Sequence, residues 1–291
     1  MKKRENPSKT IDGYLKELCL SGIRDSYEEI SGKARSESLS YEDYLLELLD
    51  REYEIRFNKR IERRLKESRL PLSKSMETFD VKVLPKKAIH QMKMLLEGDF
   101  LDRCENVLAF GNPGSGKTHL LSAISQELIK KGRRIYFTTS SLLVQELLWA
   151  KKNLRLVNLL KKLSRFEALL IDDIGYVQQD RSEIEVLFTL LAERYEKGSL
   201  MITSNLPFSK WDTIFKDPMT TAAAIDRLVH HSIILELNVS SYRMNHAKTK
   251  GLIPQYDNEE NVHAATLAEP KKPLLSNLNA KNSAANRQNE E

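Results

Sequence analysis

The sequence of 291 residues has little cysteine, no long apolar run and no apolar segment behind its basic start. Cys19 and Cys104 lie far apart and neither belongs to a CxxC pair, so we expect free thiols in a reducing cytoplasm and no metal bound by them. No stretch approaches the roughly 20 apolar residues that a membrane span requires. Because the first ten residues, MKKRENPSKT, lead into no apolar core, we expect no signal peptide and no membrane partner.

The composition allows a packed core and leans toward an anionic partner. Apolar residues make up 41% of the chain and charged residues 30%, with 46 Lys and Arg against 41 Asp and Glu, a net charge of +5. The length suits one large domain with a smaller one beside it.

Residues 106–118, NVLAFGNPGSGKT, join a short apolar run to a glycine-rich turn. The turn fits G-x-x-x-x-G-K-[ST], and residues 119–130 continue with helical spacing. Glycines let backbone N–H groups approach a polyphosphate, Lys117 can reach its β- and γ-phosphates, and the Thr118 hydroxyl can bind Mg²⁺. The alternative is a glycine-rich turn without a ligand, but the match also lies between an expected strand and an expected helix, as a phosphate-binding loop must. We therefore predict an ATP site formed by Gly111, Asn112, Pro113, Gly114, Ser115, Gly116, Lys117, Thr118 and His119.

Two further apolar segments end in polar residues that suit hydrolysis. Residues 167–173, EALLIDD, read as a buried strand ending in Asp172, which would hold Mg²⁺, and Asp173, which would polarise the attacking water. The alternative is that this acid pair caps the next turn. Asn205 follows the expected strand 199–204, where it could orient a water near the γ-phosphate or serve as a turn residue before Pro207.

Two segments are strongly basic. The first is the second half of an expected helix with Ser40 as its N-cap, where residues 51–69 carry a net charge of +4. It could be a solvated helix held by ion pairs or a face that follows DNA phosphates. The second runs from 149 to 166 without an acidic residue, and we predict that it contacts nucleic acid. The predicted DNA-binding residues there are Lys151, Lys152, Arg155, Lys161 and Lys162.

The order of these segments predicts four parts. Residues 1–70 should form a small all-α domain that binds a partner or DNA, with a break near Gly22, and 71–84 should be a linker. Residues 85–252 alternate strand and helix patterns, which predicts an α/β ATPase core. Residues 253–291 are polar and read as a disordered tail.

With these pieces in order, the sequence resembles the IstB family, ATP-binding helpers of insertion-sequence transposases within the DnaA/DnaC branch of the AAA+ ATPases. The N-terminal matches carry most weight, because any P-loop protein could share the core motifs. The matching segments are LKELCLSGIRDSYEEI, LSYEDYLLELLDREYEIRFNKRIERRLK, LPLSKSMETFD, GNPGSGKTHL, LLIDDIGYV, ERYEKGSLMITSNLPFSKW, AAAIDRLVHH and SYRM.

The resemblance implies a three-layer αβα core with a parallel sheet and assigns roles to individual residues. Asn205 would be the sensor residue, and Arg227 would be an arginine finger inserted into the neighbouring subunit's site; an ion pair between Arg227 and Asp226 is disfavoured because adjacent helical residues do not face each other. Arg243 would contact the nucleotide or a neighbour. After residue 250 no sequence is long enough for the usual helical lid, so we expect the linker near Phe79 and Asp80 to form part of the adenine pocket.

The function implied is an ATP- and Mg²⁺-dependent ATPase that forms a ring or spiral of identical subunits on double-stranded DNA and assists a cognate transposase. Three alternatives remain open: a DnaC-like loader of a replicative helicase, a small-molecule P-loop kinase, and a nucleotide-binding scaffold that has lost hydrolysis.

Overall fold

The computed structural model describes residues 7–175, 180–211, 218–239 and 241. The helices are α1 (Pro7–Glu17), α2 (Ser21–Glu37), α3 (Tyr41–Ser68), α4 (Lys86–Glu97), α5 (Asp99–Asp102), α6 (Lys117–Lys130), α7 (Ser140–Lys152), α8 (Leu156–Leu163), α9 (Arg181–Arg194) and α11 (Pro218–Val229), with 3₁₀ turns η1 (Val81–Val83) and η2 (Phe208–Lys210). The strands are β1 (Asn106–Phe110), β2 (Ile135–Thr139), β3 (Ala168–Ile174), β4 (Ser199–Ser204) and β5 (Ser232–Glu236). No helix in these ranges is both long and apolar enough to cross a bilayer.

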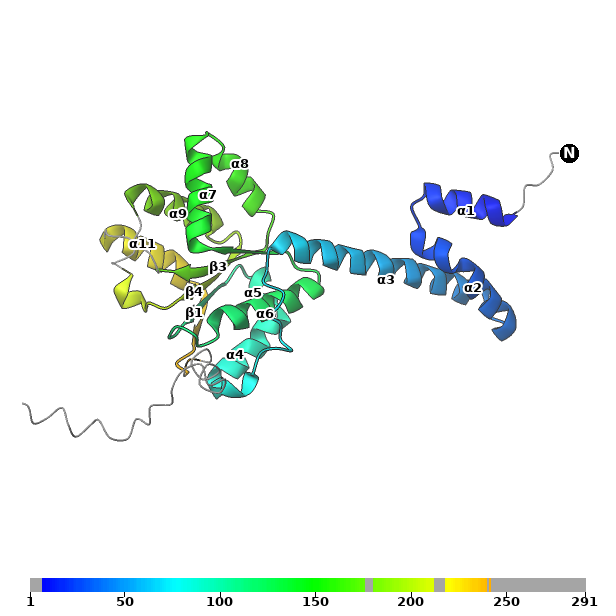
Figure 1. The fold of residues 1–291 in the computed structure, drawn as a ribbon, viewed down its shortest axis with the longest axis horizontal. Helices are drawn as coiled ribbons and strands as arrows, with labels where there is room; N and C mark the ends of the chain where they lie inside the picture. Colours follow the sequence, from blue (N-terminus) through cyan, green and yellow to red (C-terminus); the bar gives the residue numbers. More distant parts are fainter. Residues whose placement is uncertain (1–6, 176–179, 212–217, 240, 242–291) are drawn as a thin grey trace, which may run out of the picture. The chain divides into compact units, whose positions relative to one another are not determined.

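The five strands form one parallel sheet in the order β2-β3-β4-β1-β5 (Figure 1). The central strand β1 pairs on both sides, with Val107 opposite Met201 of β4 and opposite Ile233 of β5. Strands covered on both faces need nearly continuous apolar sequence, which is what the runs in β1, β3 and β4 supply. All strand carboxyl ends therefore meet at one edge of the sheet, the edge that carries the glycine-rich turn.

Helices cover both faces of the sheet, which confirms the predicted three-layer αβα architecture. On one face α7, α9 and α11 bury Leu143, Leu187 and Leu228 in one apolar cluster with strand residues. On the other face α4 and α6 bury Met92 and Leu120 in a second cluster. Fully burying a side chain of this size stabilises the fold by roughly 1.5–3 kcal/mol, so the two clusters fix the sheet between its helices.

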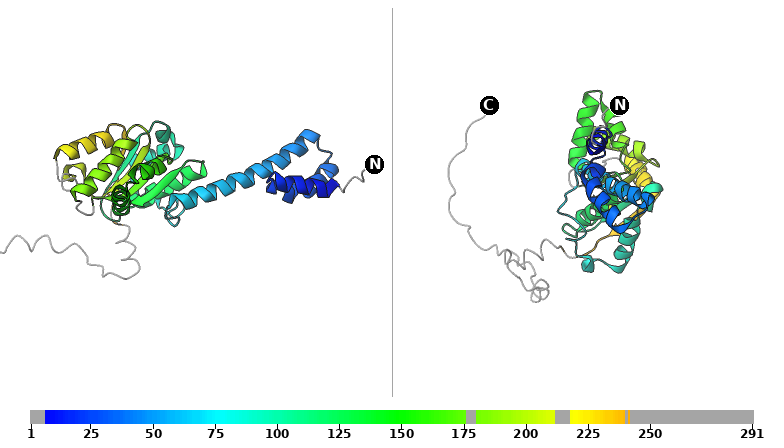
Figure 2. Two further views of the ribbon diagram at one scale, coloured as in Figure 1. Left: turned by 90° about the horizontal axis from the view of Figure 1, so that it is seen from above. Right: turned by 90° about the vertical axis from the view of Figure 1, so that its right-hand side faces the viewer.

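Helices α1, α2 and the first half of α3 lie together (Figure 2), and residues of all three form a small apolar cluster of their own. The predicted cap of α3 is confirmed, since Ser40 Oγ accepts from the backbone N–H of Asp43. The predicted break at Gly22 is wrong. The chain turns at Cys19, whose φ is +56°, and Gly22 lies in the first turn of α2.

Gly22 is needed for packing, because a Cβ there would lie 2.9 Å from the backbone of Glu52 on α3. This close approach lets the buried Glu52 carboxylate accept from the N–H groups of Gly22 (2.6 Å) and Ile23 (3.2 Å). Arg56 donates to the other carboxylate oxygen at 2.6 Å. Burial opposes ionisation of Glu52, but these hydrogen bonds outweigh it and hold its pKa below the usual value. Glu52 therefore acts as an N-cap supplied from a neighbouring helix.

The carboxyl end of α3 contacts α6 and β2. Some of the contacts in this region are made by basic residues of 51–69, for which a DNA-binding role was one of the two interpretations of the sequence. Arg64 donates to the carbonyl of Gly132. Arg69 pairs with Glu146 at 3.2 Å and its guanidinium lies 5.3 Å from the ring centre of Tyr136. Part of the basic segment 51–69 is thus engaged in holding α3 against the core. The predicted tail at 253–291 and the region where a lid would follow both lie outside the described residues.

Candidate functional site

The glycine-rich turn connects β1 to α6 with backbone conformations that only glycine adopts readily. The φ angles of Gly111, Gly114 and Gly116 are +151°, +81° and +91°. A Cβ at Gly111 would collide with the carbonyl of Leu237, and one at Gly116 would lie 3.3 Å from the ring of Phe79. The turn is therefore closely packed from two sides, with its backbone facing a cavity.

The start of α6 has the features of an anion site. Gly116 is its N-cap and supplies no side-chain hydrogen bond, so the first N–H groups of the helix keep their donor capacity. The hydroxyl of Ser115 is buried and has no hydrogen-bond partner within the described part of the chain. Lys117 is only 6% exposed, and its Nζ donates to the carbonyl oxygens of Gly111 (2.8 Å) and Asn112 (3.0 Å). A buried ammonium beside the N-terminus of a helix suits phosphate.

Two acidic residues at the end of β3 face this turn. Neighbouring strand residues normally point to opposite faces, but Asp173 has a φ of +63° and the pairing with β4 shifts register between Ile171 and Ile174. As a result Asp172 Oδ1 accepts from Thr118 Oγ1 at 2.7 Å, while Asp173 lines the same cavity as the glycine-rich turn. A hydroxyl and a carboxylate that meet in this way are oxygen ligands of the kind that Mg²⁺ prefers, so the residues present fit that ion.

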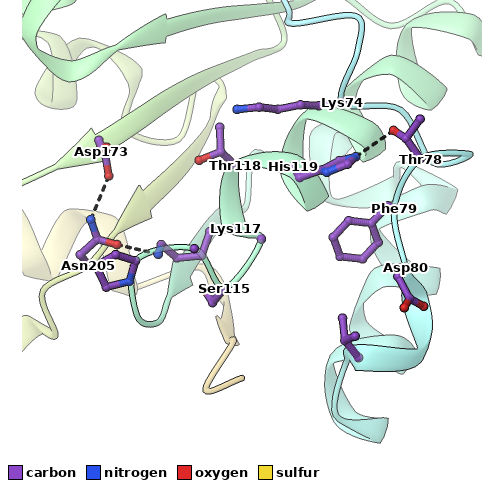
Figure 3. A pocket seen from close by; sticks show the side chains of 14 residues that line it. Lys74, Thr78, Phe79, Asp80, Ser115, Lys117, Thr118, His119, Asp173 and Asn205 are labelled. Atoms are coloured by element: carbon purple, nitrogen blue, oxygen red, sulfur yellow. Dashed lines mark hydrogen bonds between the residues drawn. The ribbon is translucent and has the colours of Figure 1, made fainter. Parts of the chain in front are cut away.

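Asn205 connects the two halves of the site. Its Oδ1 accepts from Lys117 Nζ at 2.6 Å, and its Nδ2 donates to Asp173 Oδ1 at 3.1 Å (Figure 3). Thr203, which the sequence did not single out, adds a second link: its hydroxyl donates to Asp172 Oδ1 at 2.6 Å and accepts from the N–H of Asp173 at 2.8 Å. The only sequence feature that could have identified Thr203 is its position one residue before the end of β4, the strand next to β3. These links fix the Asp173 carboxylate in the wall of the cavity and the Asp172 carboxylate next to Thr118.

The linker forms the opposite wall of the cavity. Phe79, Asp80, Thr78 and Lys74 line it together with the glycine-rich turn, around a volume of about 400 Å³. In Figure 3, Phe79 and Asp80 lie on one side of the turn, and Asn205 and Asp173 lie on the other.

His119 and Gln126, both on α6, hold the linker in place. The His119 ring contacts Thr78 Oγ1 and the Ser75 carbonyl, each at 3.1 Å, and meets the Phe79 ring edge-on at 5.1 Å. Burial lowers the pKa of His119, which favours the neutral form of its ring. Gln126 Nε2 donates to the carbonyls of Pro71 and Lys74, at 3.2 and 3.0 Å. Because α6 also begins at the glycine-rich turn, the linker and the turn are fixed to one element.

Arg227 lies elsewhere, at the edge of the sheet where the strands begin. Its backbone carbonyl accepts from the side chain of Asn106, the first residue of β1, and its guanidinium lies 4.4 Å from the ring centre of Phe188. It lines a second cavity that includes Glu196 and His231 and none of the residues of the glycine-rich turn. Within the described ranges Arg227 forms no ion pair with Asp226. Arg227 therefore cannot reach the phosphate site of its own chain. Arg243 lies outside the described residues.

The basic segment 151–165 covers the end of α7 and all of α8. The expectation that its charge is uncompensated is wrong at Lys151, which pairs with Glu185 of α9 at 2.7 Å. Lys152, Arg155, Lys161 and Lys162 are exposed, and no ion pair involves them within the ranges that the structure covers. Between them Leu154 is 95% exposed. This surface presents cations around an apolar tip.

Comparison with known proteins gives related ATP-binding proteins. The model of the family described as IstB-like ATP binding protein matches residues 13–250. The chain is 41% identical to an insertion-sequence ATP-binding protein of Sinorhizobium fredii over 249 residues, 84% of each protein. It is 35% identical to the ATP-binding protein of insertion sequence IS21 from Pseudomonas aeruginosa, covering 84% of this chain and 92% of that protein.

Solved structures share the fold at lower sequence identity. AMPPCP-bound DnaA from Aquifex aeolicus matches with a TM-score of 0.51 and 20% identity, covering 62% of this chain and 55% of that one. The crystal structure titled DnaI matches with a TM-score of 0.50 and 20% identity, covering 58% of this chain and 94% of that one. At this level the likeness concerns the fold alone, which is that of the AAA+ ATPase core.

Proposed function

This chain belongs to the family of IstB-like ATP-binding proteins, and from that premise we propose that it is a DNA-binding ATPase that assembles on DNA and assists the transposase of an insertion sequence. The observation that carries the proposal is the division of the catalytic groups. Lys117, Asn205 and Asp173 form one connected network at the carboxyl edge of the sheet. Arg227 lies at the opposite edge. A single chain therefore holds an incomplete site.

In the proposed reaction the triphosphate lies on the glycine-rich turn. Lys117 exchanges its carbonyl partners for phosphate oxygens, and the adenine ring lies against Phe79. Asp173 accepts the proton of the attacking water, which Asn205 orients. Mg²⁺, held by Thr118 and Asp172, would neutralise phosphate charge when bound.

Arg227 would come from a neighbouring subunit. A finger supplied in trans stabilises the charge of the transition state, and such groups typically raise kcat by about 10³–10⁵. The contact that carries it is heterologous, with different surfaces meeting on the two subunits, so repetition produces a ring or a spiral. Hydrolysis would then depend on assembly.

The DNA contact is assigned to the exposed cations of α7 and α8. Lys152, Arg155, Lys161 and Lys162 lack acidic partners among the described residues, and repetition of this surface around an assembly would follow a duplex backbone without reading its sequence. The relatives are ATP-binding proteins of insertion sequences, which favours a transposase over a replicative helicase as the protein partner.

The test is the particle size of the full chain in solution, with and without ATP and duplex DNA. We expect a large complex only when ATP and DNA are both present. Arg227→Ala should retain ATP binding and lose ATP turnover, whereas Arg35→Ala, an exposed arginine on α2, should behave as the wild type. A wild-type chain that stays monomeric with both ligands would refute the assembly.

A further inference from the structure

Two turns that the nucleotide site does not use meet at the amino edge of the sheet. Residues 195–198 connect α9 to β4, and residues 230–231 connect α11 to β5. Strands β4 and β5 flank β1 on either side, so the beginnings of these strands lie about 10 Å apart, two strand spacings. Side chains from the two turns can therefore meet across the start of β1.

Asn106, the first residue of β1, fixes the two turns to each other. Its Oδ1 accepts from the N–H of Leu200 on β4 at 2.9 Å, and its Nδ2 donates to the carbonyl of Leu228 on α11 at 3.1 Å. Its own N–H donates to the carbonyl of His231 at 2.7 Å. Asn106 thus ties the start of β4, the end of α11 and the backbone of His231 to the central strand.

Three side chains of these turns converge. One ligand atom each from Glu196, His230 and His231 lie within 4.8 Å of one another. Ligand atoms about 2.0–2.1 Å from a tetrahedral zinc ion lie roughly 3.4 Å from one another. Side-chain rotations that move these exposed atoms by about 1 Å would therefore bring all three to coordination distance. Two imidazoles with one carboxylate suit zinc or a related transition-metal ion, whereas calcium and magnesium prefer sites made of oxygen.

Neighbouring residues hold these side chains in position, as the residues around metal ligands commonly do. Tyr195 Oη lies 3.3 Å from His230 Nδ1, so it can accept a hydrogen bond from Nδ1–H in the tautomer that leaves Nε2 for a metal. Glu196 has a φ of +57°, a conformation uncommon for glutamate, in a turn where the N–H groups of Lys197 and Gly198 both donate to the Arg194 carbonyl. The buried guanidinium of Arg194 in turn donates to the carbonyls of Leu163, Phe166, Glu167 and Ser199. The carboxylate is therefore carried on a rigid turn.

We propose that Glu196, His230 and His231 bind one zinc ion per chain, with water as the fourth ligand. His231 and Glu196 line the same cavity as Arg227, so a bound dication would repel the guanidinium and alter where it points. That consequence for ATP turnover rests on the proposed role of Arg227. The binding of the ion does not, because all three ligands belong to one chain.

The experiment titrates ZnCl₂ into the full-length chain, freed of metal with EDTA and dialysed, in a calorimeter without nucleotide or DNA. Co²⁺ serves as a spectroscopic probe, since its visible bands report tetrahedral coordination. We expect one ion per chain, and His230→Ala, His231→Ala and Glu196→Ala should each weaken binding by more than about tenfold. Tyr195→Phe should weaken it less.

Controls separate this site from other donors. His90→Ala and Cys19→Ser replace exposed residues away from the site and should leave zinc binding unchanged. Circular dichroism in EDTA should show the same fold for every variant. The proposal is overturned if the wild type shows no saturable binding of either ion, or if the variants His230→Ala and His231→Ala bind as the wild type does. Because neither ATP nor assembly enters the measurement, its failure would leave the proposed ATPase untouched.

Discussion

Replacement of Phe79 by alanine should separate recognition of the base from recognition of the phosphates. The Phe79 ring closes the wall of the nucleotide cavity, 3.3 Å from where a Cβ on Gly116 would be and edge-on to His119 at 5.1 Å. It is held there by the linker, so its removal leaves the glycine-rich turn intact. Loss of one contact between a base and an aromatic ring costs about 1–3 kcal/mol, which corresponds to a dissociation constant for ATP roughly 5–150 times higher.

The assay compares two ligands, ATP and inorganic tripolyphosphate, by competition against a fluorescent ATP analogue. Phe79→Ala should weaken ATP and leave tripolyphosphate unchanged, and Phe79→Tyr should retain most of the affinity for ATP. Lys117→Ala should weaken both ligands, because its ammonium contacts only the phosphates. The reasoning about the linker is refuted if Phe79→Ala affects neither ligand, or weakens both by the same factor.

Asn205→Ala should lower kcat for ATP by about 10²-fold with little change in KM, because Asn205 links Lys117 to Asp173 and does not contact the adenine ring. Steady-state phosphate release measures both constants, and a change in KM alone would contradict this role. Lys162→Ala should reduce the slope of log affinity for DNA against log salt by about 1, and Lys151→Ala by clearly less, because Glu185 already neutralises Lys151; equal slopes would argue against α8 as the contact. Glu52 has a lowered pKa in the folded chain, so its contribution is present above its unfolded value and is lost as the pH falls through the folded value. Thermal or urea unfolding should therefore show Glu52→Gln less stable than the wild type by about 1–3 kcal/mol at pH 7, with the difference shrinking as the pH is lowered into the acid range, whereas Glu54→Gln, on an exposed side chain, should match the wild type throughout.

Local signals in the sequence predicted the strands of the sheet and the turn between β1 and α6, for physical reasons. A strand buried on both faces must be apolar along its length, so β3 and β4 are visible as uninterrupted runs. Gly111 and Lys117 are recognisable because the turn between a strand and a helix fixes their spacing. Asp172 is recognisable because it follows an apolar run. Ser40 predicts the start of α3 because an N-cap side chain bonds to a backbone N–H only three residues away.

Contacts between distant segments were not predictable in this way. Gly22 looked like a helix breaker, and only the approach of Glu52 explains a glycine inside α2. Lys151 looked free because its acid, Glu185, comes from another helix. Arg194 is buried among backbone carbonyls, and this burial lowers its pKa to about 10, yet in the sequence it is one more cation at a helix end. Such partners are determined by tertiary packing, and the pattern of charges along the sequence does not reveal them.

Each hydrolytic site is proposed to need residues from two copies of the chain, and a mixture of two inactive variants is the sharpest test of this sharing. Arg227→Ala lacks the finger but keeps its own Asp173, and Asp173→Asn lacks the base but keeps its finger. Alone, each should show almost no ATP turnover in the presence of DNA. Mixed in equal amounts, they should recover up to about a quarter of the wild-type rate, since half of the sites keep the acid and half of their neighbours supply the arginine. A mixture as inactive as its components, or an Arg227→Ala variant that turns over ATP normally by itself, would contradict the shared site.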